Sequence, residues 1–198
     1  ECYQDESAIY MLLEIVQGGE LWSYVYERRD ETRGFRSPLG GFVPRAATFY
    51  AGCVAAALAH VHACGVAYRD LKPENLLVDA EGHVSLIDMG LAARVAEKTL
   101  SRTSRGGTDC YMAPEVRWAR KRRTAYSFSA DWYTVGVLLY EFTHGALPYT
   151  NRDTEPPQYR GGTWPSEEAK LIGESLMVQD HRKRLGSGPR GALEIKEH

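Results

Sequence analysis

The sequence predicts an α+β fold, with short strands at the beginning and in the middle of the chain and helices over much of the remainder. A β-prone apolar run at 8–16 ends at two glycines, and two short apolar runs flank a turn-rich tetrad at 79–82. Helical signals begin at residues 44, 131 and 166. The 198 residues are 43% hydrophobic and 25% charged, which suits a globular domain with one sizeable core.

Charge, apolar patterning and cysteines narrow the class of function. The formal net charge of -2 predicts neither a nucleic-acid partner nor a membrane surface. No apolar run approaches the roughly 18 residues of a membrane span. The four cysteines contain no CxxC pair, which favours a reducing, cytoplasmic setting over a zinc site or a disulfide framework. Because the chain begins at Glu1 within strand-like sequence, we expect it to be part of a longer protein.

The first half of the chain is expected to run from strand to loop to helix. Residues 8–16 predict a buried strand that breaks at the two glycines. Residues 27–43 are charged and then rich in Gly and Pro, which indicates an exposed loop or a small insertion. Pro44 suits the first turn of a helix, and an Ala-rich stretch continues it until Gly65 ends it. We expect this long helix to be buried.

A β-hairpin is predicted around the tetrad Asp79-Ala80-Glu81-Gly82, with strands at 76–78 and 84–87. Antiparallel pairing brings the end of a hairpin back to its beginning. The flanking residues Asn75 and Asp88, both with oxygen ligands on their side chains, should therefore lie near each other.

Two further helices are expected after a loop-like stretch at 89–128. The first begins at Asp131 and ends before Gly145. Its apolar face should consist of Trp132, Val135, Leu138, Leu139 and Phe142. The second begins at Ser166, with acidic residues in its first turn that suit the helix dipole. The residues expected to enter the core from it are Leu171, Ile172, Leu176 and Met177.

The run Tyr68-Arg69-Asp70-Leu71-Lys72-Pro73-Glu74-Asn75 and the tripeptide Asp88-Met89-Gly90 carry groups that phosphoryl transfer requires. Transfer from ATP needs a base for the acceptor hydroxyl, a cation near the moving phosphate and oxygen ligands for Mg²⁺. A lone Arg-Asp pair would more simply be a turn with solvated charges, but the whole run resembles the signature of the protein kinase family. The resemblance implies that Asp70 accepts the proton of the substrate hydroxyl and that Lys72 neutralises the γ-phosphate. It also implies that Asn75 and Asp88 bind Mg²⁺.

The segment Gly107-Thr108-Asp109-Cys110-Tyr111-Met112-Ala113-Pro114-Glu115 resembles the end of a kinase activation segment. The position of Thr108 in it is typical of Ser/Thr kinases, so the resemblance assigns Thr108 to the catalytic site. It also pairs Glu115 with Arg184 in a buried ion pair; the alternative is a surface pair worth under about 1 kcal/mol. Asp131 should hold the catalytic-loop backbone, with helix N-capping as the alternative.

The nucleotide site is assigned by the same resemblance. Backbone groups of Glu14 and Val16 should contact adenine, Glu20 should reach the ribose, and Glu74 belongs to the same site. Leu77 should form the adenine floor, although core packing explains a Leu in this strand equally well.

The kinase group is indicated by Tyr68, by Gly18-Gly19-Glu20 and by the C-terminal run 184–198, which resemble the AGC group. Within it the chain looks most like G-protein-coupled receptor kinases or cyclic-nucleotide-dependent protein kinases. Glu20, Glu74 and Glu141 fall where the latter read basic residues in the substrate, but the group shares these acids too widely for them to identify a protein substrate.

The resemblance implies a kinase-like fold, mainly the helical C-lobe with the last strands of the N-lobe. Residues 1–16 should be the end of the small-lobe sheet and the hinge, and 17–198 the large lobe, with an insertion at 27–43. The Gly-rich loop and the Lys and Glu that hold the ATP phosphates are not in this sequence. We therefore expect the chain alone to be inactive. A pseudokinase, which binds or scaffolds without catalysis, is the alternative.

Two further assignments remain open. Arg69 implies activation by a phosphate on the activation segment, for which Ser104 is the expected acceptor. The alternative is that Ser101, Thr103 and Ser104 are ordinary solvated loop residues. His60 and His62 could be considered as metal ligands, but they lie in an Ala-rich helix. A packing or surface role is therefore expected for them.

Overall fold

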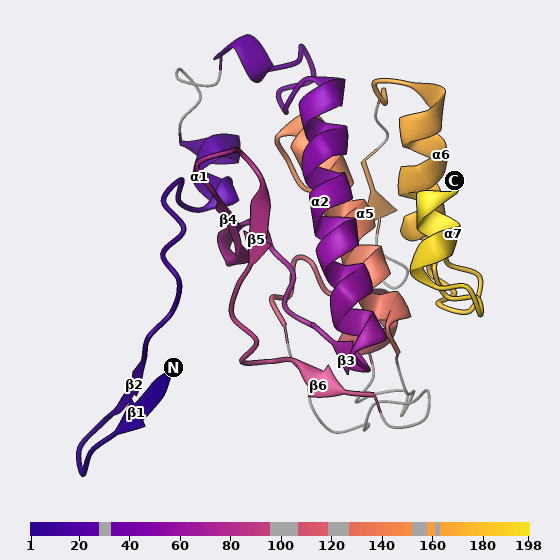
Figure 1. Cartoon of the computed structure of the whole chain (residues 1–198). Helices are drawn as coiled ribbons and strands as arrows, with labels where there is room; N and C mark the ends of the chain where they lie inside the picture. The colour runs from indigo at the N-terminus through magenta and orange to yellow at the C-terminus, as the bar shows by residue number, and fades with distance from the viewer. Residues whose placement is uncertain (28–32, 96–106, 119–126, 152–157, 161–162) are drawn as a thin grey trace.

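The computed structural model describes residues 1–27, 33–95, 107–118, 127–151, 158–160 and 163–198. Helix α2 (Pro44–Ala63) lies against α5 (Ser129–His144), and α5 in turn contacts α6 (Glu167–Leu176). Helix α7 (Ala192–Lys196) contacts α2. The described strands form short two-stranded sheets, of which β4 (Leu76–Val78) with β5 (Val84–Leu86) lies beside α2, and β3 (Val66–Ala67) with β6 (Ala93–Arg94) at the C-terminal end of α2 (Figure 1). The expected α+β fold class is confirmed.

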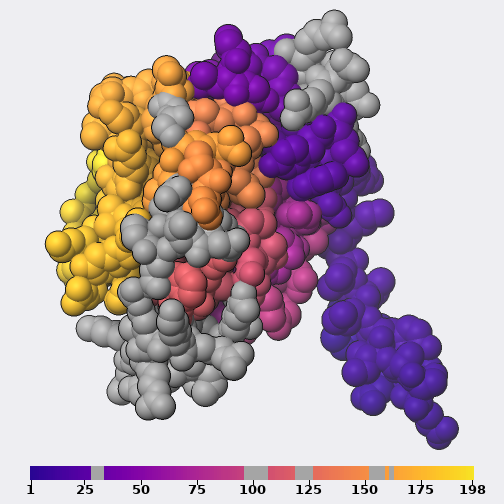
Figure 2. All heavy atoms as spheres, turned by 180° about the vertical axis from the view of Figure 1, so that it is seen from behind, coloured from indigo at the N-terminus to yellow at the C-terminus, as the bar shows by residue number. Residues whose placement is uncertain are grey.

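The N-terminal strands form an exposed hairpin, so the prediction of a buried strand at 8–16 is wrong. β1 (Cys2–Gln4) pairs with β2 (Ile9–Met11) in an antiparallel sheet that stands away from the body (Figure 2). Ile9 and Ile15 are 70% and 81% exposed. Their apolar side chains remain in solvent because no further layer of the described chain covers this hairpin.

Helix α2 begins with Pro44 as predicted, and Gly65 turns the chain out of it with a φ of 73°. Its expected full burial is wrong, since the buried residues are Ala47, Val54 and Leu58. A helix that packs on the body from one side buries one stripe and leaves the opposite face exposed.

Contrary to the expectation from the sequence, α2 is long and apolar enough by length and composition to cross a membrane, with a mean hydropathy of 1.3. In the structure it contacts α5, β5 (Val84–Leu86), α7 and β3 (Val66–Ala67), which follows it. The apolar composition of α2 is therefore used here to pack the helix against the globular body.

The predicted hairpin is present as β4 (Leu76–Val78) and β5, with Leu76 opposite Leu86. Within the stretch expected to be loop-like, β6 (Ala93–Arg94) pairs with β3, and α3 spans Pro114–Arg117. The other short elements are α1 (Leu21–Tyr26), η1 (Arg33–Phe35), η2 (Pro73–Asn75), β7 (Tyr149–Asn151) and β8 (Gln158–Tyr159).

The two later helices follow their predicted bounds closely. α5 is buried from Ser129 to Thr143 on all faces and ends at Gly145, whose φ is 64°. α6 begins at Ser166, whose hydroxyl accepts a hydrogen bond from the Ala169 N–H at 3.1 Å. Leu176 enters the core as expected, but Leu171 is 50% exposed because it lies on the solvent side of the helix.

The described part of 27–43 is anchored to the body rather than fully exposed. Phe42 is buried, and its N–H donates to the Phe142 carbonyl of α5 at 2.6 Å. The Arg36 guanidinium donates to the Val25 carbonyl at the end of α1 at 2.8 Å. This segment therefore joins α1 to α5; residues 28–32 lie outside the described residues.

Candidate active site

The carboxylate of Asp70 is the centre of a hydrogen-bonded cluster between β3 and η2. One oxygen accepts from both the N–H and the hydroxyl of Thr108, each at 2.9 Å. The other accepts from the Lys72 ammonium at 2.9 Å, and that ammonium also donates to the Thr108 hydroxyl at 3.1 Å. The fold thus brings together all three residues assigned to catalysis, although Thr108 is distant in the sequence.

Asn75 stabilises the loop at 68–75, to which the resemblance assigns catalysis and which is called the catalytic loop below. Its amide nitrogen donates to the backbone carbonyl of Asp70 at 2.9 Å and, more weakly, to the Asp70 carboxylate at 3.3 Å. Both residues are buried, at 6% and 7% exposure. The amide oxygen of Asn75 is the atom left to act as an acceptor or a metal ligand.

Electrostatics keep Lys72 charged. Burial disfavours its ammonium form, but the hydrogen bond to Asp70 and the negative charges of Asp70 and Glu74 outweigh burial and raise the pKa of Lys72. A charged ammonium beside the Asp70 carboxylate is the arrangement that can neutralise a phosphate nearby.

The hairpin returns the chain to the catalytic loop, as predicted. The Ile87 N–H donates to the Asn75 carbonyl at 3.0 Å, and the Tyr68 hydroxyl donates to the Ile87 carbonyl. Asp88, the next residue, has a left-handed φ of 57° and an exposed carboxylate, one oxygen of which accepts the Gly90 N–H. Within the described ranges no three His, Cys, Asp or Glu side chains form a metal cluster. An oxygen site here would therefore consist of Asp88 and the Asn75 amide.

The backbone before Asp70 is held by Asp131. Arg69 has a left-handed φ of 76°, which is unusual for a residue with a side chain. The Asp131 carboxylate accepts the N–H groups of Tyr68 and Arg69 at 2.8 and 2.9 Å. Phe128, not Asp131, occupies the N-cap position of α5, so the N-capping alternative does not apply.

His62 of α2 also contacts Asp131, which the sequence did not reveal. Its Nε2 lies 2.8 Å from the Asp131 carboxylate oxygen that accepts the Tyr68 N–H. The two residues are 69 positions apart, and no spacing rule links them.

Glu115 and Arg184 form a bidentate ion pair, with N–O distances of 2.6 and 2.9 Å. The side chains are 5% and 0% exposed, so this is a buried pair rather than a surface pair. Arg184 also donates to the carbonyls of Ser129 and Val178, at 2.7 and 3.0 Å. The pair connects the end of the activation segment to the base of α5.

The residues assigned to the nucleotide fall into two groups. Glu20 and Leu77 form a β-bridge, next to backbone hydrogen bonds of 2.8 Å that join the two glycines before Glu20 to Val78. Glu14 and Val16 instead lie on the extended segment that leads to the N-terminal hairpin, and Glu14 is exposed.

The segment assigned to activation is described only at its end. Ser101, Thr103 and Ser104 lie outside the described residues. Gly107 has a φ of 112° and lies against the backbone of Arg69. A Cβ at this position would be 2.5 Å from the Arg69 carbonyl oxygen, so glycine fits here and a larger residue does not.

Glu141, which falls where cyclic-nucleotide-dependent kinases read basic residues in the substrate, is fully buried in α5. One carboxylate oxygen accepts hydrogen bonds from the hydroxyls of Tyr26 and of Tyr111, the latter at 2.9 Å. Burial raises the pKa of Glu141 to about 7, although the two tyrosine hydrogen bonds oppose this shift and Glu74 contributes to it. The carboxyl therefore links α1, the activation segment and α5.

This buried carboxyl predicts a pH-dependent stability. In the unfolded chain, the Glu141 carboxyl loses its proton above the ordinary pKa of 4.5. In the folded chain it keeps the proton up to about pH 7. Its contribution to the free energy of unfolding should be fully present below about pH 4.5 and lost as the pH rises to about 7 and beyond, on the order of 3 kcal/mol in all. Urea unfolding at about pH 5 and about pH 8 measures this difference. Glu141→Gln should reduce it, and an unchanged pH dependence in that variant would contradict the assignment.

Comparison with known proteins agrees with this geometry. The model of the protein kinase domain family matches residues 1–198. Ribosomal protein S6 kinase alpha-1 from Homo sapiens is 36% identical over 208 residues, covering 99% of this chain and 26% of that protein. Ribosomal protein S6 kinase alpha-4 from Homo sapiens is 33% identical over 210 residues, covering 99% and 25%. Serine/threonine-protein kinase AtPK2/AtPK19 from Arabidopsis thaliana is 35% identical over 202 residues, covering 99% and 40%.

These relatives are considerably longer than the chain, which spans 25% to 40% of their length. They support the expected AGC group, while the likeness to receptor kinases or cyclic-nucleotide-dependent kinases within it stays a prediction. Because the family model covers the whole chain, this chain belongs to the protein kinase family, in its AGC group.

Proposed function

We propose that the full-length protein is a cytoplasmic Ser/Thr protein kinase that transfers the γ-phosphate of ATP to Ser or Thr hydroxyls of protein substrates. The observation that carries this proposal is the cluster of Asp70, Lys72 and Thr108, hydrogen-bonded to one another within 3.1 Å. A base, a cation and a positioning hydroxyl meet in one place. Neither a nucleic acid nor a membrane is required by this chemistry.

In the proposed reaction Asp70 is the base. A carboxylate offers about four acceptor sites, of which Thr108 fills two and Lys72 one, while Asn75 occupies the fourth only weakly at 3.3 Å. A substrate hydroxyl would take the place of this weak bond. Asp70 would orient that hydroxyl toward the phosphate and take its proton. Lys72, two residues away, would balance the negative charge of the phosphate as it moves between oxygens.

The side chains around the hairpin fit Mg²⁺. The carboxylate of Asp88 and the amide oxygen of Asn75 are hard oxygen ligands, and Mg²⁺ characteristically takes few protein ligands together with phosphate oxygens. Asp88 and Asn75 would hold the ion there, and its positive charge would offset the negative charge of the phosphates. The Gly90 N–H already holds one oxygen of the Asp88 carboxylate.

The nucleoside is assigned to the junction of Glu20 and Leu77, which form a β-bridge. Glu20 would reach the ribose there, and Leu77 would form the adenine floor. Glu14 and Val16 precede this junction, and we propose that they contact adenine through their backbone. We assign residues 1–16 to the end of the small lobe and its hinge, and 17–198 to the large lobe. The phosphate-holding groups of the small lobe are not in this sequence, so ATP should bind poorly to residues 1–198 alone.

The proposal is tested by comparing the full-length protein with residues 1–198, each with Mg²⁺ and γ-labelled ATP on a mixed protein substrate. The full-length protein should label Ser and Thr, as judged by phosphoamino-acid analysis, and residues 1–198 should label little. Label on Tyr, or strong activity in residues 1–198, would contradict the proposal. Nucleotide binding by the full-length protein without any transfer would instead favour a kinase-like binding module.

A second prediction concerns the Thr108 hydroxyl. Thr108→Val removes the group that donates to Asp70 and accepts from Lys72. The kcat of the full-length protein should fall about 10- to 100-fold, the usual loss for a hydrogen bond to a charged group. Thr108→Ser keeps the hydroxyl and should stay within a few-fold of wild type. Equal losses in both variants would argue against a role for the hydroxyl.

A further inference from the structure

We propose that His62 is a positioning residue of the catalytic loop, which acts by holding the carboxylate of Asp131. The inference rests on the proposed kinase function for its effect on turnover. Its structural basis is independent of that function, because every contact involved lies within the described chain. His62 belongs to α2, whereas Asp131 belongs to α5 and the loop follows β3.

His62 is held by one polar contact and by two aromatic rings. Its Nε2 lies 2.8 Å from an Asp131 carboxylate oxygen, and the His62 side chain is 9% exposed. The imidazole stacks on the ring of Phe128, with centroids 4.5 Å apart, and meets the edge of the Trp132 ring at 4.9 Å. A ring held in this way keeps its N–H directed at one oxygen.

Asp131 needs this third donor. Its carboxylate is 2% exposed, and a buried charge is costly unless it is well hydrogen-bonded. One oxygen accepts only the Arg69 N–H among the described donors, while the other accepts the Tyr68 N–H and His62. Without His62 the carboxylate would be held by the same two amides that it is meant to position.

The position of the Asp131 carboxylate affects the backbone at Tyr68 and Arg69, directly before the proposed base Asp70. Arg69 has a left-handed φ of 76°, and such a conformation persists only where the surroundings fix it. Asp131 supplies that constraint at the amides of Tyr68 and Arg69, and Asp70 follows directly. A looser Asp131 would therefore misplace the base without removing any group that touches substrate.

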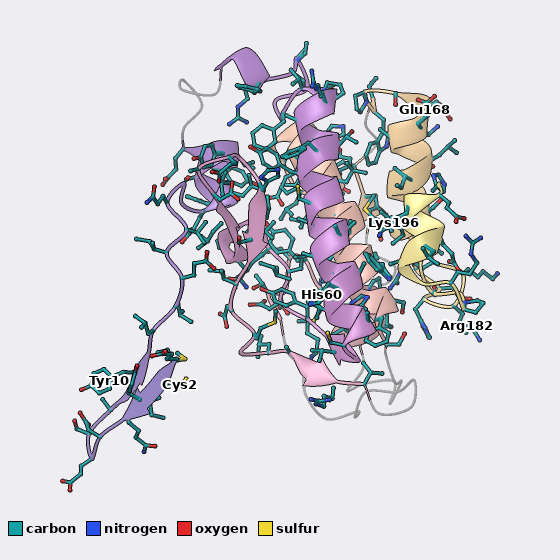
Figure 3. All side chains as sticks on the ribbon, in the orientation of Figure 1. Cys2, Tyr10, His60, Glu168, Arg182 and Lys196 are labelled. Carbon is teal, nitrogen blue, oxygen red and sulfur yellow. The ribbon has the colours of Figure 1, made fainter. Side chains whose placement is uncertain are left out.

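The kinetic test compares three variants of the full-length protein. His62→Ala should lower kcat about 10- to 100-fold and leave the KM for ATP within about twofold. His62→Gln, which keeps an N–H donor at a similar distance, should restore most of the kcat. His60→Ala is the matched control, since His60 is an exposed histidine two residues earlier on α2 (Figure 3). Loss of activity in His60→Ala of the same size, or no rescue by Gln, would overturn the proposal.

Amide hydrogen exchange tests the same inference without any catalysis, so it separates this proposal from the proposed function. In His62→Ala the amides of Tyr68 and Arg69 should exchange faster, while those in the middle of α5 keep their protection. His62→Gln and His60→Ala should retain wild-type exchange at both positions. Unchanged exchange at Tyr68 and Arg69, or a uniform acceleration throughout the chain, would refute a positioning role.

Discussion

Replacing Asp70 by Asn in the full-length protein is expected to lower the kcat for phosphoryl transfer by about 10²- to 10⁴-fold. Asn has the size of Asp and can still accept the Thr108 N–H, so the loop should keep its fold. An amide, however, cannot take the proton of the substrate hydroxyl, and it removes the negative charge that faces Lys72. Steady-state kinetics with a Ser- or Thr-containing substrate measure the loss.

Asp79→Asn is the matched control for this prediction. Asp79 also accepts backbone N–H groups, from Glu81 at 3.0 Å and from His83 at 2.8 Å, but it lies in the hairpin turn. Its replacement should leave kcat within a few-fold of wild type. Nucleotide binding should persist in Asp70→Asn, which distinguishes a lost base from a lost fold. Full activity in Asp70→Asn would remove the central support for the proposed mechanism.

The largest expected effect on stability comes from Arg184→Ala, which should lower the free energy of unfolding by about 3 to 5 kcal/mol. The guanidinium is buried, binds Glu115 through two nitrogens and lies 4.9 Å above the Tyr133 ring. Its removal leaves the Glu115 carboxylate buried without its cation. Denaturant unfolding of wild type and variant under identical conditions measures the loss.

Arg182 offers a close control, because its guanidinium lies 2.9 Å from Asp180 but its side chain is 77% exposed. Arg182→Ala should show no comparable loss, since water already screens that pair. The double variant Glu115→Leu, Arg184→Met should be less destabilised than Arg184→Ala, because it leaves no unpaired charge. Equal destabilisation of Arg182→Ala and Arg184→Ala would show that burial does not decide the strength of these pairs.

Helix ends and the hairpin turn were predicted correctly, because the residues that specify them lie within a few positions of each other. Pro44 and Gly65 predicted the ends of α2, Ser166 predicted the start of α6, and the tetrad at 79–82 predicted the position of the hairpin. The hairpin also predicted correctly that the chain returns from Asp88 toward Asn75. These features depend on capping, turn geometry and antiparallel pairing, which short stretches of chain can specify alone.

Burial was predicted less well, since it depends on what packs against an element. The apolar run at 8–16 has the pattern of a buried strand, yet nothing in the described chain covers it. Phe42 shows the reverse case, because it comes from a Gly- and Pro-rich stretch and is 3% exposed against α5. Apolar side chains favour burial, but they become buried only where a neighbouring element packs against them.

The sequence by itself determined which family this chain belongs to and which short runs match that family's catalytic motifs, because Asp70, Lys72 and Asn75 stand at fixed spacing along one loop. The tertiary structure alone decided what supports those residues. Thr108 meets Asp70, His62 meets Asp131, and Tyr26 meets Glu141 across separations of 38, 69 and 115 residues. Contacts over such separations have no local signature, since they form only when the helices pack and bury these polar groups together.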